Sequence, residues 1–221
     1  LRLAALLPAQ GMLTLVDPAT GIAAEVELGA SFDHMSLVTS IVGETPGGAD
    51  VALLWSSTGP RIAFVALGAT MGQPYKSVEI LELGHAVGTA LEVPAPNDHL
   101  RILTSPNGRD HVVLDLLART ASPIWSRDTG SVVVPAPDGL RAWIHASGRS
   151  LAQLDLGSLH PRNLELSYPI RSVFDVARAD GGRALVAVHE TGAVAVTLLD
   201  AYAPDPAYAR EYLGVMLGGL E

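Results

Sequence analysis

Short apolar runs separated by turn-forming residues fill most of the chain. In Ile22–Leu28 the apolar residues alternate with Glu25 and Glu27, and this period of two is typical of a half-buried β-strand. Val78–Leu83 alternates in a similar way. Turn signals end the runs, and Ser105-Pro106-Asn107-Gly108 is one of the strongest. The pattern therefore predicts antiparallel strands joined by tight turns, with almost no helix.

One stretch, residues 131–200, contains the same pattern twice. Asp138-Gly139-Leu140-Arg141-Ala142 returns as Asp180-Gly181-Gly182-Arg183-Ala184, and each copy precedes an apolar run, a glycine-containing turn and a second apolar run ending in Leu-Asp. The arginines are 42 residues apart, the turn glycines 44 and the Leu-Asp pairs 45. A period of this size, built only from short strands and turns, is typical of a β-propeller blade.

The sequence thus predicts an all-β fold, a β-propeller of four-stranded antiparallel blades in a single domain spanning 1–221. About five blades are expected, with the bounds 1–28, 34–83, 99–127, 131–168 and 172–217. The first has three strands and lacks its opening one. The last ends in a strand at 210–217, which we prefer to the helix that its composition also favours. A four-stranded sheet cannot bury both faces alone, so the blades are expected to stack on one another.

Two arrangements of these blades stay open. One is a five-bladed ring with an irregular first blade. The other is part of a six- or seven-bladed ring, whose missing strands come from residues before Leu1 or from another chain. We favour the second, which predicts a native mass above the calculated 23.0 kDa.

The turns resemble those of the YVTN and WD40-like propeller superfamily. The residues that carry the resemblance are Val16-Asp17-Pro18-Ala19-Thr20-Gly21, Ser105-Pro106-Asn107-Gly108-Arg109, Pro137-Asp138-Gly139-Leu140-Arg141 and Asp180-Gly181-Gly182-Arg183. The sequence departs from WD40 proteins proper, because no Trp-Asp pair is expected to end a strand and no Gly-His pair to open a blade. The resemblance implies the fold, and it does not bring WD40 partners with it.

Composition excludes several classes of function. Apolar residues make up 48% of the chain and charged residues 17%, so the chain is expected to fold around buried strands. The net charge of −9 without a cationic block argues against a nucleic-acid or anionic-membrane surface. The lack of cysteine removes disulfides, thiolate metal sites and cysteine nucleophiles. No apolar run reaches the roughly 20 residues of a membrane span. The compartment stays open, with a periplasmic or extracellular location favoured over a cytoplasmic one.

Histidines and neighbouring carboxylates are the candidate metal ligands. Asp98, His99, Asp110 and His111 lie in predicted loops, and a metal site would need them to converge on one channel. Isolated polar residues on turns are the simpler expectation. His145 and His189 end comparable strands, where they would line one rim or satisfy their own hydrogen bonds.

Other features point to structure more than to chemistry. Glu25/Glu27 and Glu79/Glu82 are expected on solvated faces, and no nucleophile elbow, P-loop or dinucleotide fingerprint is present. Core or inter-blade packing is expected for Trp55, Trp125 and Trp143, in preference to a ligand-stacking platform. The repeated Arg141 and Arg183 are expected to have structural roles, either bridging to an acidic side chain in the next blade or capping exposed strand edges.

The function expected from the sequence is a non-catalytic binding or scaffold module for a protein partner, without a cofactor. Two alternatives stay open, which are a lactonase-type hydrolase with a channel metal and a structural subunit of a larger envelope assembly.

Overall fold

The computed structural model describes residues 3–38, 51–124, 131–146, 148–177, 179, 183–190, 195–199 and 210–213, with side chains described up to residue 190 except at residue 69. Within these residues the regular structure is nineteen β-strands and one 3-10 turn, Pro8–Gln10. No helix in the described part of the chain is long and apolar enough to cross a membrane. The all-β class expected from the sequence is confirmed.

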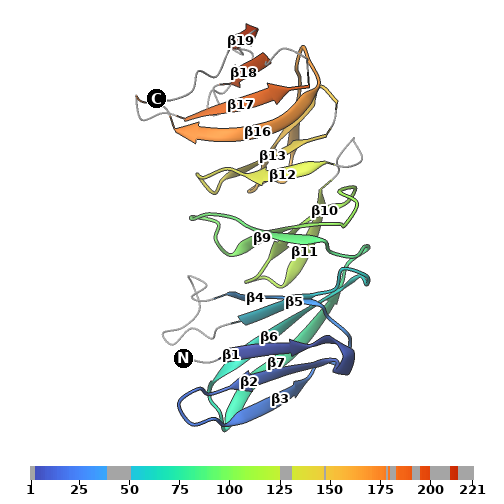
Figure 1. Cartoon of the computed structure of the whole chain (residues 1–221), viewed down its shortest axis with the longest axis vertical. Helices are drawn as coiled ribbons and strands as arrows, with labels where there is room; N and C mark the ends of the chain where they lie inside the picture. Colours follow the sequence, from blue (N-terminus) through green and yellow to red (C-terminus); the bar gives the residue numbers. More distant parts are fainter. Residues whose placement is uncertain are drawn as a thin grey trace. The chain divides into compact units, whose positions relative to one another are not determined.

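The strands of the described residues form five sheets, and in each the strands follow one another in chain order (Figure 1). The first sheet has three strands, β1 (Leu3–Leu7), β2 (Met12–Val16) and β3 (Ala23–Glu27). The second has four, β4 (His34–Val38), β5 (Val51–Trp55), β6 (Arg61–Thr70) and β7 (Gln73–Glu82). The third has β8 (Thr89–Glu92), β9 (Leu100–Thr104), β10 (His111–Asp115) and β11 (Thr120–Ile124).

The last two sheets contain the sequence repeat. The fourth consists of β12 (Val132–Pro135), β13 (Arg141–His145), β14 (Ser150–Asp155) and β15 (Pro161–Glu165). The fifth consists of β16 (Ile170–Ala177), β17 (Arg183–His189), β18 (Ala195–Leu199) and β19 (Arg210–Leu213). Arg141 and Arg183 each begin the second strand of their sheet, so the repeat predicted their equivalence correctly.

One expected unit needs correction. The sequence placed three strands in 99–127 and treated 84–98 as an aperiodic connection, but β8 lies inside that connection and opens the third sheet. β8 is only four residues long, and all of them are exposed or half-buried, so it carries no apolar run.

The chain divides into two compact units. Unit 1 contains residues 1–90, 103–106 and 112–122, and unit 2 contains 91–102, 107–111 and 123–221. Each unit has its own stacked core.

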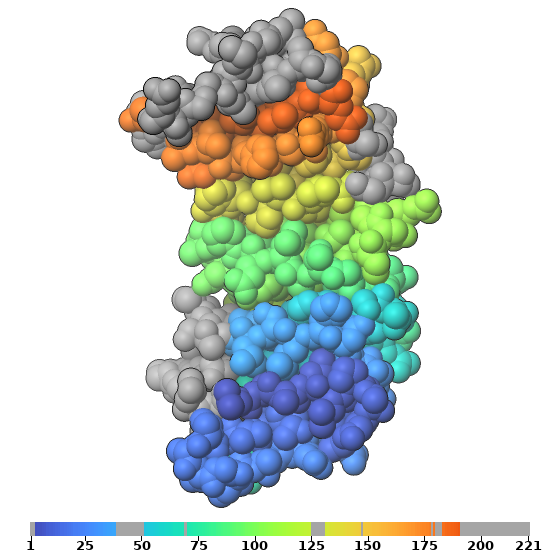
Figure 2. Space-filling view, viewed as in Figure 1, coloured from blue at the N-terminus to red at the C-terminus, as the bar shows by residue number. Residues whose placement is uncertain are grey.

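In unit 1 the second sheet is covered on both faces. Alternate residues of β5 point to opposite sides, and all five are buried. Leu53 belongs to a cluster with Leu103 and Leu114 of the third sheet, whereas Leu54 belongs to one with Leu13 of the first sheet. Figure 2 shows the side chains of the first sheet, in blue, packed closely against those of the second. Unit 2 repeats this packing, because Trp143 and Leu151 of the fourth sheet share a cluster with Leu185 of the fifth.

A recurring backbone hydrogen bond fixes the register of three sheets. Each of three leucines follows the last residue of its sheet's last strand. Its N–H donates to a carbonyl in the turn that precedes the last strand but one. The pairs are Leu28 to Gly11 (2.9 Å), Leu83 to Pro60 (2.6 Å) and Leu166 to Arg149 (2.9 Å). Because a glutamate precedes each leucine, Glu-Leu is a sequence signal for the end of a sheet that the turn patterns did not reveal.

A second link joins successive sheets. The carbonyl in the turn after the second strand accepts an N–H from the residue at or just before the start of the next sheet. The pairs are Val87 to Ser56 (3.0 Å), Ser131 to Gly108 (2.8 Å) and Ile170 to Gly148 (2.9 Å). These turns and connectors thus lie at the same end of the strands in each sheet. We call this set of loops the rim.

Candidate functional site

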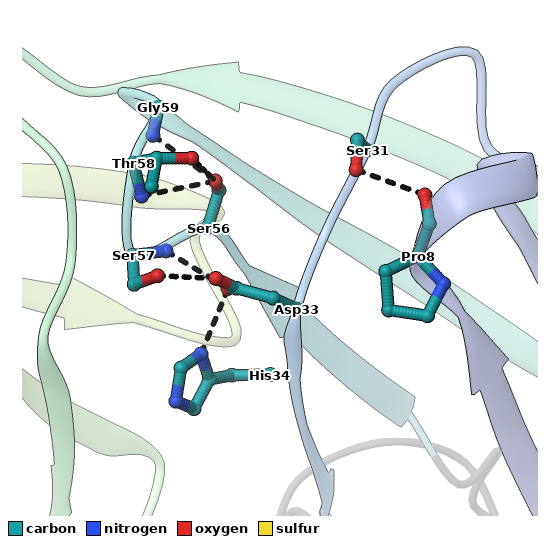
Figure 3. A network of polar contacts seen from close by, with 8 residues as sticks. All are labelled: Pro8, Ser31, Asp33, His34, Ser56, Ser57, Thr58 and Gly59. Carbon is teal, nitrogen blue, oxygen red and sulfur yellow. Dashed lines mark hydrogen bonds and ion pairs between the residues drawn. The ribbon is translucent and has the colours of Figure 1, made fainter.

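The rim of unit 1 is built around Asp33, at the end of the connector between the first and second sheets (Figure 3). Its carboxylate accepts hydrogen bonds from the backbone N–H of Ser57 (2.8 Å), from the Ser57 hydroxyl and from Nδ1 of His34 (2.8 Å). The backbone N–H of Asp33 also donates to the carbonyl of Trp55 (3.1 Å). One side chain therefore ties the connector to the turn that follows β5.

These bonds set the charge of the site. Burial alone would raise the pKa of Asp33, but the hydrogen bonds from Ser57 and His34 outweigh it and lower the pKa to about 2. Asp33 is therefore an anion throughout the neutral range. Because a carboxylate only accepts, Nδ1 of His34 carries the proton.

His34 itself is presented to solvent. Its side chain is 44% exposed, and that of Asp33 is 36% exposed. The imidazole stacks on the Trp55 indole with ring centroids 5.4 Å apart and an interplanar angle of 15°. The stack fixes the ring, and in the neutral form of the imidazole with its proton on Nδ1, the Nε2 atom is a hydrogen-bond acceptor.

The neighbouring turn is internally bonded as well. Ser56 Oγ accepts the backbone N–H groups of Thr58 (3.3 Å) and Gly59 (3.0 Å), and on the other side Ser31 Oγ donates to the carbonyl of Pro8 (2.9 Å). A shallow pocket of about 500 Å³ adjoins Ser31, with Gln10, Met12 and Glu27 among its lining residues. The unit 1 rim is thus a set of loops held rigidly by short-range polar contacts.

The Asp33 cluster contains the residue types of a serine hydrolase, but not their geometry. In such enzymes the histidine takes the proton of the serine hydroxyl and the carboxylate orients the histidine. Here the Ser57 hydroxyl and His34 both bond to Asp33, so the histidine does not accept the serine proton. The cluster therefore lacks the contact between serine and histidine on which that proton transfer depends.

In unit 2 the rim holds a buried histidine–serine pair. His111 Nε2 lies 2.5 Å from Ser131 Oγ, and Ser131 Oγ donates to the carbonyl of Gly108 (3.0 Å). Because the single hydroxyl proton goes to Gly108, His111 is the donor to Ser131. Both side chains are buried, and the pair anchors the turn at Gly108 to the start of the fourth sheet.

His145 and His189 occupy equivalent places in unit 2, as the repeat predicted. Each ends the second strand of its sheet and is buried, and they stand opposite Val132 and Ile170 respectively. His189 Nδ1 contacts the carbonyl of Pro169 at 3.2 Å. Nδ1 of His145 has no hydrogen-bond partner among the residues that the structure describes, and desolvation by burial lowers the pKa of this imidazole. Both rings are therefore part of the packing beneath the rim.

The four candidate metal ligands do not converge. Asp98 and His99 immediately precede β9, whereas Asp110 and His111 follow the turn at the other end of that strand. The carbonyl of Asp98 accepts a hydrogen bond from Arg101 (2.8 Å). No group of three His, Asp or Glu side chains with metal-binding proximity occurs among the residues that the structure describes.

The remaining candidates have packing roles where they are described. Trp55 and Trp143 are buried in hydrophobic clusters, and Trp125 lies outside the described residues. Arg183 Nε lies 2.6 Å from Asp175 Oδ1 in the neighbouring strand of its own sheet. The Gly214–Gly219 segment and the carboxyl-terminal part of the expected strand at 210–217 also lie outside the described residues.

The sequence alone does not reveal the Asp33 site, because Asp33 and Ser57 are 24 residues apart and meet only once two sheets have stacked. A usable signal was the adjacent Asp33-His34 pair at the opening of a predicted strand.

Comparisons with known proteins leave the family open. No protein-family model matches the chain, and no curated protein matches it. Among the solved structures that match is one described as a functionally unknown protein from Desulfotomaculum acetoxidans DSM 771, with a TM-score of 0.49 and 13% identity. The match covers 95% of this chain and 63% of that one, so the chain spans less than two thirds of the length of its structural neighbour.

Proposed function

We propose that this chain is a β-propeller-type binding module whose rim holds a protein partner without catalysing a reaction. The propeller arrangement is supported by sheets that stack face to face within each unit and by the backbone links between successive sheets. Such stacking covers both faces of each sheet and leaves the loops at the strand ends for binding.

The Asp33 cluster is the observation that carries the binding proposal. Its hydrogen bonds fix two loops before any partner arrives, and yet the Asp33 carboxylate and the His34 imidazole stay partly exposed. A surface that is ordered in advance loses less conformational entropy on binding. An anion beside an acceptor nitrogen fits a partner that presents cationic or hydrogen-bond-donating side chains.

Paired variants test this proposal. Asp33→Ala removes the cluster, whereas Asp17→Ala removes another exposed turn carboxylate, which accepts the N–H of Ala19 (2.9 Å) at the far end of the strands. Both proteins are immobilised after circular dichroism shows that they are folded, and the proteins that they capture from the native extract are compared quantitatively with the wild type.

We expect at least one protein that wild type and Asp17→Ala capture equally and that Asp33→Ala loses. If the two variants and the wild type capture the same proteins in the same amounts, the rim of unit 1 is not the binding surface.

A further inference from the structure

The Asp33 carboxylate is not neutralised by a permanent cation. Its partners among the described residues are Ser57, through the backbone N–H and the hydroxyl, and Nδ1 of His34 (Figure 3). Oδ1 accepts two of these three hydrogen bonds and Oδ2 accepts one, so one of the roughly four lone-pair positions of the carboxylate stays free. The side chain is 36% exposed, and a donor from another molecule can therefore reach it.

The imidazole of His34 is held beside this carboxylate. His34 and Trp55 stand opposite each other in the register of β4 and β5, and their rings stack with an interplanar angle of 15°. Trp55 takes one face of the imidazole and Asp33 takes its Nδ1 edge, so the exposed 44% of the side chain belongs mainly to the other face and the Nε2 edge. A flat group that reaches Asp33 thus meets a fixed aromatic surface next to it.

The loops around Asp33 add negative charge. Ser31, two residues earlier on the same connector, lines the shallow pocket of about 500 Å³, and the one charged residue among the described residues of that lining is the exposed Glu27. Arg61, which begins β6 after the rim turn, stands opposite Glu82 in the register and so has a carboxylate of its own beside it. The surface therefore suits a cation that comes from outside.

We propose that this site binds the guanidinium group of an arginine side chain of the protein partner. The guanidinium lies flat on the exposed face of His34, where it extends the stack of Trp55 and His34, and it donates one N–H to the free position of the Asp33 carboxylate. The inference rests on the proposed rim function and names the chemistry by which the partner is recognised.

Arginine fits these two contacts better than lysine does. Its guanidinium is planar, stacks on aromatic rings and is weakly hydrated, whereas the lysine ammonium is a strongly hydrated point charge. An ion pair at an exposed site contributes little by itself, because solvent and salt screen it. The stacking contact on His34 therefore decides the preference, which should favour arginine over lysine by about threefold or more.

Three small probes separate the charge of the ligand from its shape. They are the N-acetyl amides of arginine, of lysine and of citrulline, which has nearly the shape of arginine without its charge. Each probe is titrated into the full chain at constant ionic strength. The NMR shifts of the Trp55 indole N–H and of the Ser57 backbone N–H give its dissociation constant.

We expect the arginine probe to shift both resonances and to bind the wild-type chain about threefold or more tightly than either other probe. This comparison needs no variant, so it does not depend on the folding of an altered chain.

Two variants then remove the contacts one at a time. Asp33→Asn removes the charge and should weaken binding of the arginine probe about two- to fivefold. His34→Asn removes the ring but keeps a side-chain N–H that can reach Asp33, so the arginine and lysine probes should bind this variant equally. Asp17→Ala, at the far end of the strands, should bind all three probes as the wild type does.

Equal binding of the arginine and lysine probes to the wild type would overturn the proposal, and so would arginine binding that Asp33→Asn leaves unchanged. These results are separate from the capture experiment. If Asp33→Ala loses a captured protein but the arginine probe does not bind, the rim function stands and the guanidinium site is wrong. If the arginine probe binds as expected but no capture depends on Asp33, the guanidinium site stands and the protein-binding function is wrong.

Discussion

β1 of the first sheet and β5 of the second are both built from apolar residues, but their side chains are buried to very different extents. Leu53 of β5 is completely buried between two sheets, whereas Leu3 of β1 is more than half exposed. Both strands alternate apolar residues on two faces, so their sequences alone do not distinguish them. The difference teaches that burial in this molecule is decided by what stacks on a sheet and by the strand beside it.

Truncating one leucine in each sheet should give the largest contrast. Leu53→Ala leaves a cavity in a core that cannot easily collapse, and it should lower the free energy of unfolding by about 2–5 kcal/mol. Leu3→Ala removes a side chain that already contacts water, and it should cost less than about 1 kcal/mol. Urea unfolding followed by tryptophan fluorescence measures both. Similar losses would mean that the outer face of the first sheet is covered in solution.

The same contrast shows how far the sequence predicts the fold. Alternation and turn signals identified most strands, because each depends on residues that are neighbours in the chain. β8 was missed, since a short strand without buried residues leaves no periodic signal. The equivalence of Arg141 and Arg183 was predicted, because a repeat preserves position even where side-chain contacts differ.

The candidate site was less predictable for a related reason. Asp98 and His99 are neighbours in the chain, and so are Asp110 and His111, which made them candidate metal ligands. The sequence also predicted the strand that separates the two pairs, but it did not predict where their side chains point. The Asp33–Ser57 contact depends on the stacking of one sheet on another, which local patterns do not specify. Its chemistry was therefore visible only in the folded chain.

A second, smaller contrast concerns the turn that precedes the last strand but one in the first and second sheets. Gly11 has φ +62°, and an added Cβ would lie 3.2 Å from the carbonyl oxygen of Ala30, so Gly11→Ala should cost about 1–2 kcal/mol. An added Cβ at Gly59, which lacks such a φ, would lie 3.4 Å from Ser56 Oγ. Gly59→Ala should change stability by no more than about 0.5 kcal/mol.

Thermal and urea unfolding of both glycine variants check this prediction. A larger loss of unfolding free energy for Gly59→Ala than for Gly11→Ala would contradict the prediction. It would mean that Gly11, whose N–H donates to the carbonyl of Pro8, does not hold its left-handed conformation in solution.

The smallest expected effect concerns the hydrogen bonds of Asp33, which link the first-to-second-sheet connector to the turn after β5, and it is seen in how stability falls at acidic pH. The folded pKa of Asp33 is about 2, below the ordinary 3.8 of a free aspartate. Its contribution to stability is therefore fully present above pH 3.8 and is lost as the pH falls toward 2. Because the carboxylate is partly exposed and screened, Asp33→Asn should cost at most about 1 kcal/mol at neutral pH.

The difference in unfolding free energy between Asp33→Asn and wild type should shrink as the pH is lowered from 3.8 toward 2. Ser57→Ala removes one hydrogen-bond donor, so it should move the Asp33 pKa part of the way back toward 3.8. Carboxyl chemical shifts followed by NMR measure that pKa directly. A wild-type Asp33 that titrates near 3.8 would mean that the connector and the turn after β5 are not joined in solution, and the rim would then lose the rigidity on which its proposed binding role depends.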